Sequence, residues 1–133
     1  MERIQQHPLP IIHAMLICDK VIAEEKTRKK SLIGVFDTFN YTQLPFAIPE
    51  LWVYVNLSDV LEEHSIKIEF VHLDENRIIA EIKSKLSGKG NPNQELGYCF
   101  RNMRFEKDGT YVFRFWADDD VIGEKYLRVR RTT

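Results

Sequence analysis

The stretch DGTYVFRFWADDDVIGEKYLRVRR, residues 108–131, decides the fold class of this chain. Apolar and polar side chains alternate along it, as they do in strands that bury one side. The apolar side is formed by Tyr111, Phe113, Phe115, Leu127 and Val129. The other side is formed by Val112, Arg114, Trp116, Tyr126, Arg128 and Arg130. The pattern predicts an antiparallel hairpin that turns at Asp118–Asp120, and a second sheet must cover its apolar side because an isolated hairpin is not stable in water.

The size and composition of the chain indicate one globular domain. Its 133 residues are 44% hydrophobic and 11% aromatic, which suffices for a core without disulfides or metal. The 19 basic and 20 acidic residues give a net charge of −1, so nothing attracts nucleic acid or an anionic membrane over a distance. We expect a loose lead-in over residues 1–10, a single domain over residues 11–133, and neither nucleic acid nor membrane as a partner.

The two cysteines, Cys18 and Cys99, lie among apolar neighbours, where free cysteine behaves as a small hydrophobe. The opening MERIQQHPLPIIHAML lacks the basic region and small-residue cleavage site of a secretory signal. No window approaches the roughly 18 apolar residues that span a membrane. We therefore expect a cytoplasmic protein with reduced thiols.

The remaining chain divides into short strands separated by turn signals. Residues 11–23 are long enough for a helix, but four isoleucines and one valine favour a strand. The other expected strands lie within residues 31–44, 51–58, 65–73, 77–86 and 96–105. Seven to eight strands without a long helix predict an all-β, two-sheet antiparallel sandwich.

Several single residues carry expectations of their own. Pro45 and Pro49 bracket a connection that we do not expect inside a central strand. The segment 65–73 alternates so that Lys67 and Glu69 share a solvent-exposed face, and we expect His72 to be half-exposed. Gly34 indicates a bulge or a close backbone contact.

The run DGTYVF, residues 108–113, resembles the tyrosine corner of immunoglobulin-like domains. In those domains a Tyr two residues before a core position hydrogen-bonds to nearby backbone. Phe113 stands where an antibody domain has cysteine, and Trp52 alternates out of phase with the core positions around it. The resemblance implies an immunoglobulin-like sandwich that lacks both the inter-sheet disulfide and the core tryptophan.

A second resemblance covers most of the chain, from about His13 to Val129. The segments that carry it are HAMLICDKVI, SLIGVF, PELWVYVNLSD and GTYVFRFW…IGEKYLRV. They are similar to a family of small bacterial proteins of unknown function. This resemblance implies an immunoglobulin-like or fibronectin type III-like β-sandwich, and it implies no reaction and no cofactor.

Patterns of known catalytic and metal sites do not occur in this sequence. It has no nucleophile elbow, no HExxH and no paired CxxC, and its four histidines lack metal-ligand spacing. We interpret Asp118–Asp120 as a solvated turn, because consecutive carboxylates on extended backbone point in alternating directions. A thiolate at Cys18 is disfavoured by the carboxylate of Asp19. We expect no catalytic residue, no metal and no cofactor.

Two lysine-containing segments invite a phosphate-binding interpretation. Gly88-Lys89-Gly90 lacks the length and the Ser or Thr of a P-loop, so we interpret it as a hairpin tip. The basic cluster is Lys26, Arg28, Lys29 and Lys30. Glu24 and Glu25 lie beside this cluster and no aromatic residue is interleaved with it, so we interpret it as a solvated loop.

The strongest functional signal is a set of outward-facing aromatic and Arg residues. If the strand 51–58 and the last two strands share a sheet, its outer face carries Trp52, Tyr54, Arg114, Trp116, Tyr126, Arg128 and Arg130. These residue types dominate binding hot spots, and they also form cation–π ladders that only stabilise a sheet. The leading hypothesis is a non-enzymatic module that binds a protein partner or a second copy of itself. The alternative is a small-ligand or carbohydrate-binding sandwich with a groove lined by Trp52, Tyr54 or Trp116.

Overall fold

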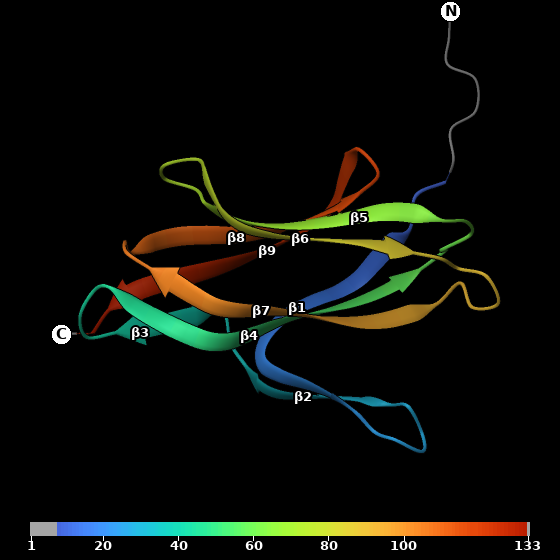
Figure 1. Cartoon of the computed structure of the whole chain (residues 1–133), viewed down its shortest axis with the longest axis horizontal. Helices are drawn as coiled ribbons and strands as arrows, with labels where there is room; N and C mark the ends of the chain where they lie inside the picture. Colours follow the sequence, from blue (N-terminus) through green and yellow to red (C-terminus); the bar gives the residue numbers. More distant parts are fainter. Residues whose placement is uncertain (1–7, 133) are drawn as a thin grey trace, which may run out of the picture.

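The computed structural model describes residues 8–132, which form nine strands in two sheets (Figure 1). The strands are β1 (Ile11–Ala23), β2 (Lys30–Val35), β3 (Thr38–Tyr41), β4 (Phe46–Ser58), β5 (His64–His72), β6 (Arg77–Leu86), β7 (Gln94–Phe105), β8 (Gly109–Ala117) and β9 (Asp120–Arg131). The predicted all-β, two-sheet class is confirmed, with one strand more than expected because the segment 31–44 divides into β2 and β3. Most of the predicted lead-in, residues 1–7, lies outside the described residues. The described part contains no helix long and apolar enough to cross a membrane.

The two sheets have the strand orders β2-β1-β4-β7 and β3-β9-β8-β5-β6. All pairs are antiparallel except β3–β9, which is parallel, so the expectation of a wholly antiparallel sandwich is wrong at one pair. The chain changes sheets between Phe36 and Asp37. The Phe36 N–H donates to the Ile17 carbonyl in one sheet (3.0 Å), and the Arg128 N–H donates to the Asp37 carbonyl in the other (2.9 Å).

The core lies between the sheets and follows the predicted alternation. Every second residue of β4 from Leu51 to Leu57 is completely buried, as are the inward residues Phe113 and Leu127 of the last hairpin. Each such side chain stabilises the fold by roughly 1.5–3 kcal/mol through burial of apolar surface. The side-chain assignment of the final hairpin is therefore confirmed.

Pro49 lies within β4, a central strand, where a proline was not expected. The reason is that β4 is flanked on both sides over only part of its length. Strand β1 pairs with β4 from Trp52 to Ser58, so at Pro49 only β7 runs alongside. A proline is tolerated where its missing N–H faces no neighbouring strand.

The alternation along β5 predicted a solvent-exposed outer face, but Glu69 on this face is buried, with only 6% exposed. His72, which we expected to be half-exposed, is 4% exposed and lies on the inner face, since it pairs with the inward-facing Tyr111. Both oxygens of the Glu69 carboxylate are engaged, one by the Trp116 indole N–H (2.8 Å) and one by the Lys67 ammonium (3.5 Å). These longer side chains cover the sheet, and paired polar groups tolerate such burial.

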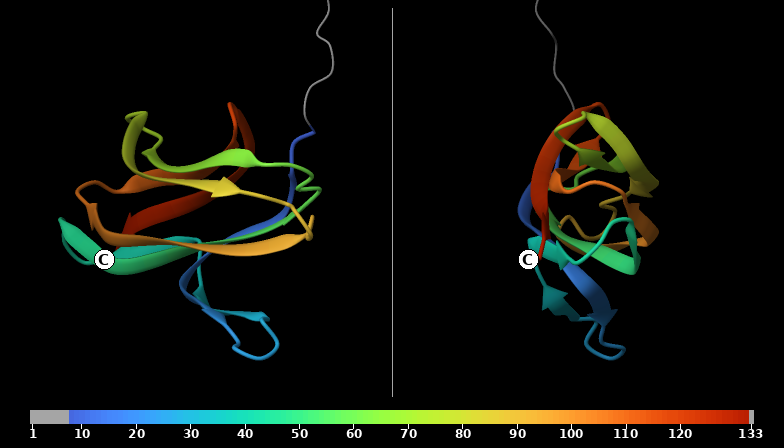
Figure 2. Two further views of the ribbon diagram at one scale, coloured as in Figure 1. Left: turned by 45° about the vertical axis from the view of Figure 1, so that its right-hand side comes forward. Right: turned by 90° about the vertical axis from the view of Figure 1, so that its left-hand side faces the viewer.

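Strands β1 and β2 form a hairpin that projects from the sandwich (Figure 2). The β1–β2 register is continuous through Gly34, so this glycine marks a close contact and not a bulge. Its φ is +69°, and a Cβ at this position would lie 2.2 Å from an Asp19 carboxylate oxygen. Only glycine suits both the left-handed backbone and this contact.

Candidate functional site

The predicted aromatic and Arg face is divided between the two sheets. Strand β4, which carries Trp52 and Tyr54, belongs to the four-stranded sheet, whereas β8 and β9 belong to the five-stranded sheet. The two sets therefore point away from each other on opposite faces of the sandwich. The prediction of one shared face is wrong because the connection 59–63 carries the chain from β4 to the opposite sheet, with Val60 buried at the crossing.

Trp52 and Tyr54 are built into a small apolar cluster under the β1–β2 hairpin. This cluster contains Cys18, Val21, Leu32, Trp52 and Tyr54. The Trp52 indole N–H donates to Glu50 (2.6 Å), and the Tyr54 hydroxyl donates to Glu95. Trp52 is half-buried and Tyr54 is buried, so both hold the hairpin in place and offer little surface to a ligand.

The two cysteine thiols are unsuited to nucleophilic chemistry. Cys18 and Cys99 are both free, and burial raises the pKa of each thiol. A raised pKa lowers the thiolate fraction at neutral pH, and the thiolate is the reactive form.

On the five-stranded sheet, Arg114 and Trp116 are occupied within the protein. Arg114 pairs with Glu124 across β8 and β9, with Nε 2.9 Å from Oε2. Trp116 donates to Glu69, and the Lys67 ammonium lies 4.7 Å from the centre of its ring. A cation–π contact is thus present, but its cation is Lys67 and not the expected arginine. These contacts stabilise the sheet.

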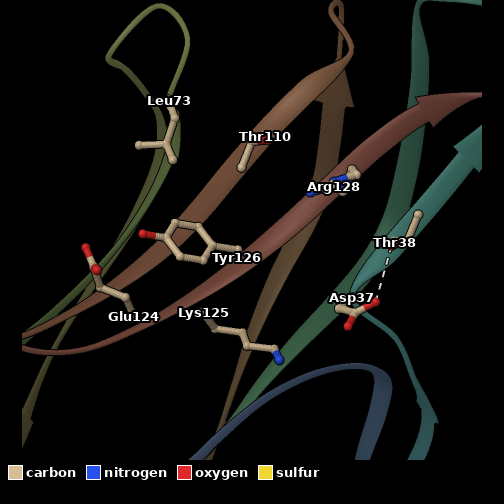
Figure 3. Close-up of a pocket in the computed structure, with 8 residues that line it drawn as sticks. All are labelled: Asp37, Thr38, Leu73, Thr110, Glu124, Lys125, Tyr126 and Arg128. Atoms are coloured by element: carbon tan, nitrogen blue, oxygen red, sulfur yellow. Dashed lines mark hydrogen bonds between the residues drawn. The ribbon is translucent and has the colours of Figure 1, made fainter.

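Tyr126 and Arg128 line a groove of about 690 Å³ on the outer side of β9 (Figure 3). The groove is lined by Asp37, Thr38, Leu73, Thr110, Glu124, Lys125, Tyr126 and Arg128. Tyr126 is 53% exposed. Figure 3 shows Tyr126 on the side of the strand that faces Leu73 and Thr110, while Lys125 leaves on the other side. Arg130 is exposed and lies outside this groove.

The groove runs along a part of β9 that has a strand on one side only. Strand β3 pairs with β9 only at residues 128–131, and among the described residues no strand pairs with this edge of β9 at residues 120–127. The Arg128 N–H points to the β3 side, since it donates to the Asp37 carbonyl. Backbone groups alternate in direction along a strand, so those of Tyr126 and Glu124 point to the same side, away from β8. Ile12 of β1 packs against Gly123, next to this segment.

Asp37, Thr38, Leu73 and Thr110 were missed by sequence reasoning. They are polar or half-buried residues at the ends of three different elements, and the change of sheets at residues 36–37 brings two of them beside β9. Asp37 and Thr38 also hydrogen-bond to each other (3.2 Å). Gly34 interrupts the apolar run shortly before the change of sheets, but the β1–β2 register is continuous at this glycine, so it does not mark the change.

The buried histidines and the acidic turn have structural partners. His64 Nδ1 lies 2.8 Å from an Asp118 carboxylate oxygen, and the Ser65 N–H donates to the other oxygen (3.0 Å). His72 Nε2 lies 3.0 Å from the Asp108 carbonyl. Within residues 8–132, no group of three or more His, Cys, Asp or Glu side chains is placed to hold a metal ion.

The grooves and clefts also bear on the carbohydrate-binding alternative. That alternative expects Trp52, Tyr54 or Trp116 to line a concave groove. The four cavities described on residues 8–132 are lined by other residues. Only Tyr126 presents a largely exposed aromatic ring to one of them.

Comparison with models of protein families gives a match over most of the chain. The model of a protein family described as a family of unknown function (DUF6941) matches residues 13–130. A search of curated proteins found no match.

Proposed function

The chain belongs to the DUF6941 family of unknown function, and from that premise we propose that it is a protein-interaction module. Its site is the groove along β9, and its ligand is an extended segment of a partner protein. The observation that carries the proposal is the unpaired edge of β9 at residues 120–127, which lies directly beside the groove. An added strand would pair with the open backbone groups of Glu124 and Tyr126, in line with β3.

The side chains around this edge support recognition of a peptide. Tyr126 and Leu73 offer an apolar surface to one residue of the segment, and Arg128 is exposed at one end of the groove. Tyrosine and arginine are frequent among residues that contribute most to binding. The acidic groups of Asp37 and Glu124 balance the cations, so the groove suits a segment of mixed charge.

The registers of β9 argue for a different protein as the partner and against a second copy. If Glu124 of one copy paired with Tyr126 of the other in a symmetric antiparallel arrangement, the Lys125 residues of the two copies would lie directly opposite each other. A pair centred on Glu124 brings two carboxylates together, and like charges directly opposite destabilise a sheet. A pair centred on Tyr126 would need the backbone of Arg128 to pair with Glu124 of the other copy, but Arg128 already pairs with β3.

We infer further that the sandwich is immunoglobulin-like. In that fold strands A, B and E neighbour one another, and strands G, F, C and C′ form the opposite sheet. The orders β1-β4-β7 and β9-β8-β5-β6 correspond to these two sets. The Tyr111 hydroxyl donates to the Lys107 carbonyl (2.5 Å), which is the hydrogen bond of a tyrosine corner.

Hydrogen exchange of the free protein should show an alternating pattern along β9. We expect the amides of Glu124 and Tyr126 to exchange at least about tenfold faster than those of Lys125 and Leu127, because only the latter point towards β8. Amide exchange followed by NMR measures this directly. Equal protection at all four positions would show that the edge is covered, and would contradict the proposal.

Peptide binding should depend on the backbone N–H of Glu124. We expect a phage-displayed library of random dodecapeptides, panned on the immobilised protein, to yield binders. Their affinity should fall at least about tenfold for Glu124→Pro, which removes an edge N–H, and change little for Glu124→Ala, which removes the same side chain but keeps the N–H. Titration calorimetry with the synthesised peptides gives these affinities.

Tyr126→Pro and Tyr126→Ala form a second pair of variants with the same logic. At both positions the N–H that proline removes points away from β8, so the hydrogen bonds between β8 and β9 stay intact. Both proline variants should therefore fold, which circular dichroism checks. Peptides that bind equally well to the proline variants would overturn strand addition. A dimer of the free protein in light scattering that the proline variants abolish would assign the edge to a second copy instead.

A further inference from the structure

A cleft of about 630 Å³ on the opposite sheet is lined by residues of the β1–β2 hairpin, of β4 and of β7. Figure 2 shows how this hairpin projects from the sandwich. The residues that line the cleft come from the hairpin tip, from β4, and from the β6–β7 connection with the start of β7. The charged ones are Arg28, Lys30, Lys89 and Glu95. The hairpin tip and the β6–β7 connection are far apart in the sequence, so the fold, and not local composition, makes this a basic cleft.

The cations of the cleft are not neutralised within the protein. Among residues 8–132, Arg28, Lys30 and Lys89 form none of the ion pairs found. The one carboxylate in the lining, that of Glu95, accepts the hydrogen bond of the Tyr54 hydroxyl. Burial together with this hydrogen bond raises the pKa of Tyr54 to about 12. Tyr54 is therefore a neutral donor at physiological pH, and the cleft keeps an excess of positive charge.

The acidic residue beside the basic cluster is used to shape the hairpin tip. The Glu24 carboxylate accepts hydrogen bonds from the Thr27 hydroxyl (2.9 Å) and from the backbone N–H groups of Lys26 (3.0 Å) and Thr27 (3.2 Å). The Thr27 hydroxyl and these N–H groups lower the pKa of Glu24. Arg28 is held at φ +63° by its N–H bond to the Glu24 carbonyl (2.8 Å). Glu24 thus fixes the conformation of the tip that carries the basic cluster.

The β6–β7 connection that presents Lys89 is also fixed. Gly88 lies so close to Val60 that a Cβ would be 1.6 Å from the Val60 carbonyl oxygen. The Val60 N–H donates to Pro92 (3.0 Å), and the Gln94 amide donates to the carbonyls of Ser87 (2.7 Å) and Asn91 (3.1 Å). Two ordered segments therefore hold cations on either side of one cleft before any ligand arrives, which lowers the cost of binding.

We propose that this cleft binds a small molecule that carries a phosphate group. Arg and Lys side chains form charge-assisted hydrogen bonds to phosphate oxygens. The volume is in the range of small-molecule sites, and Asn93, which also lines the cleft, carries an amide suited to hydroxyl groups of the same ligand. A nucleic acid fits less well, because the net charge is −1 and no exposed aromatic residue in the cleft offers a stacking surface.

NMR titration with inorganic pyrophosphate tests this proposal. We expect saturable shifts of backbone amides in residues 28–30 and 87–95. The affinity should fall about tenfold in each of Arg28→Ala, Lys30→Ala and Lys89→Ala, as loss of one charge-assisted hydrogen bond predicts. The matched controls are Lys26→Ala and Lys29→Ala, which remove the same charge from the same tip but do not line the cleft. Their affinities should change less than about twofold.

Three results would overturn the proposal. One is an equal loss of affinity in Lys30→Ala and Lys29→Ala, which would indicate diffuse attraction to a charged tip. Another is shifts that never saturate. The third is tighter binding of a single-stranded oligonucleotide than of pyrophosphate, with a steep salt dependence, which would assign the cleft to nucleic acid. All substituted residues except Lys30 are exposed, and Lys30 is half-buried, so loss of folding is not expected.

Discussion

Replacing Phe70 with alanine should lower the free energy of unfolding by about 3–5 kcal/mol, the range for deletion of a buried Phe side chain. Phe70 is completely buried on β5, at the centre of the aromatic core. Its ring contacts Phe105, Tyr111 and Phe113, with centroid distances of 5.8, 5.1 and 4.4 Å. The loss should lie in the upper part of the range, since the three surrounding rings, supplied by β7 and β8 from opposite sheets, cannot all move to fill the cavity.

Urea denaturation of the wild type and of Phe70→Ala measures this difference. Ile78→Ala is the matched control, because Ile78 lies on the neighbouring strand β6 but is 55% exposed. We expect this control to change stability by less than about 1 kcal/mol. A loss below about 1.5 kcal/mol for Phe70→Ala would mean that the two sheets do not enclose this position, contrary to the fold described above.

The alternation of side chains predicted the strands because burial on one side leaves a direct trace in the sequence. Strands β1 and β6 have the predicted bounds, and the inward residues Phe113 and Leu127 are buried as expected. The pattern works for these residues because a strand in a sandwich has one dry side, and period-two alternation reports which side it is.

Sheet membership could not be predicted in the same way. Alternation tells which side of β4 faces the core, but it does not tell which strands lie next to β4. Trp52 and Arg114 both point outward, as predicted, yet from different sheets. The connection at residues 59–63 crosses between the sheets without a sequence signal beyond the apolar Val60, so a site that spans strands depends on long-range topology.

Side-chain partners on a sheet face were also beyond the sequence. A cation–π contact was expected from the residue types, and Trp116 does stack with a cation. Its partner is Lys67, which lies directly opposite Trp116 in the β5–β8 register, while Arg114 has Glu124 opposite to it in the β8–β9 register. These partners follow from register, which is fixed only once both strands are placed.

Replacing Tyr111 with phenylalanine should lower stability at neutral pH by about 1 kcal/mol, the net value of a typical hydrogen bond. Tyr111 is 2% exposed, and its hydroxyl donates to the Lys107 carbonyl at 2.5 Å. The ring remains in Tyr111→Phe, so the contact with Phe70 is kept and the change reports on the hydroxyl. Tyr126→Phe is the control, because Tyr126 is 53% exposed and its hydroxyl has none of the hydrogen bonds found among residues 8–132.

The difference in the free energy of unfolding between the wild type and Tyr111→Phe should shrink as the pH rises above about 10. Burial raises the pKa of Tyr111 to about 12 in the folded protein, whereas an unfolded tyrosine titrates near about 10. The folded state thus holds this proton more tightly than the unfolded state. The stability that depends on it is complete below about pH 10 and is lost as the pH rises towards about 12.

Urea denaturation of both proteins from neutral pH to about pH 11 tests this linkage. Burial also raises the pKa of Tyr98 to about 12, and Tyr54 is raised as well, so both proteins should become less stable in alkali. Only the wild type also loses the stability that depends on the Tyr111 proton. Its curve of unfolding free energy against pH should therefore converge on the curve of the variant. Curves that stay parallel would show that the Tyr111 hydroxyl is not desolvated, and the assignment of a tyrosine corner at the start of β8 would lose its main physical support.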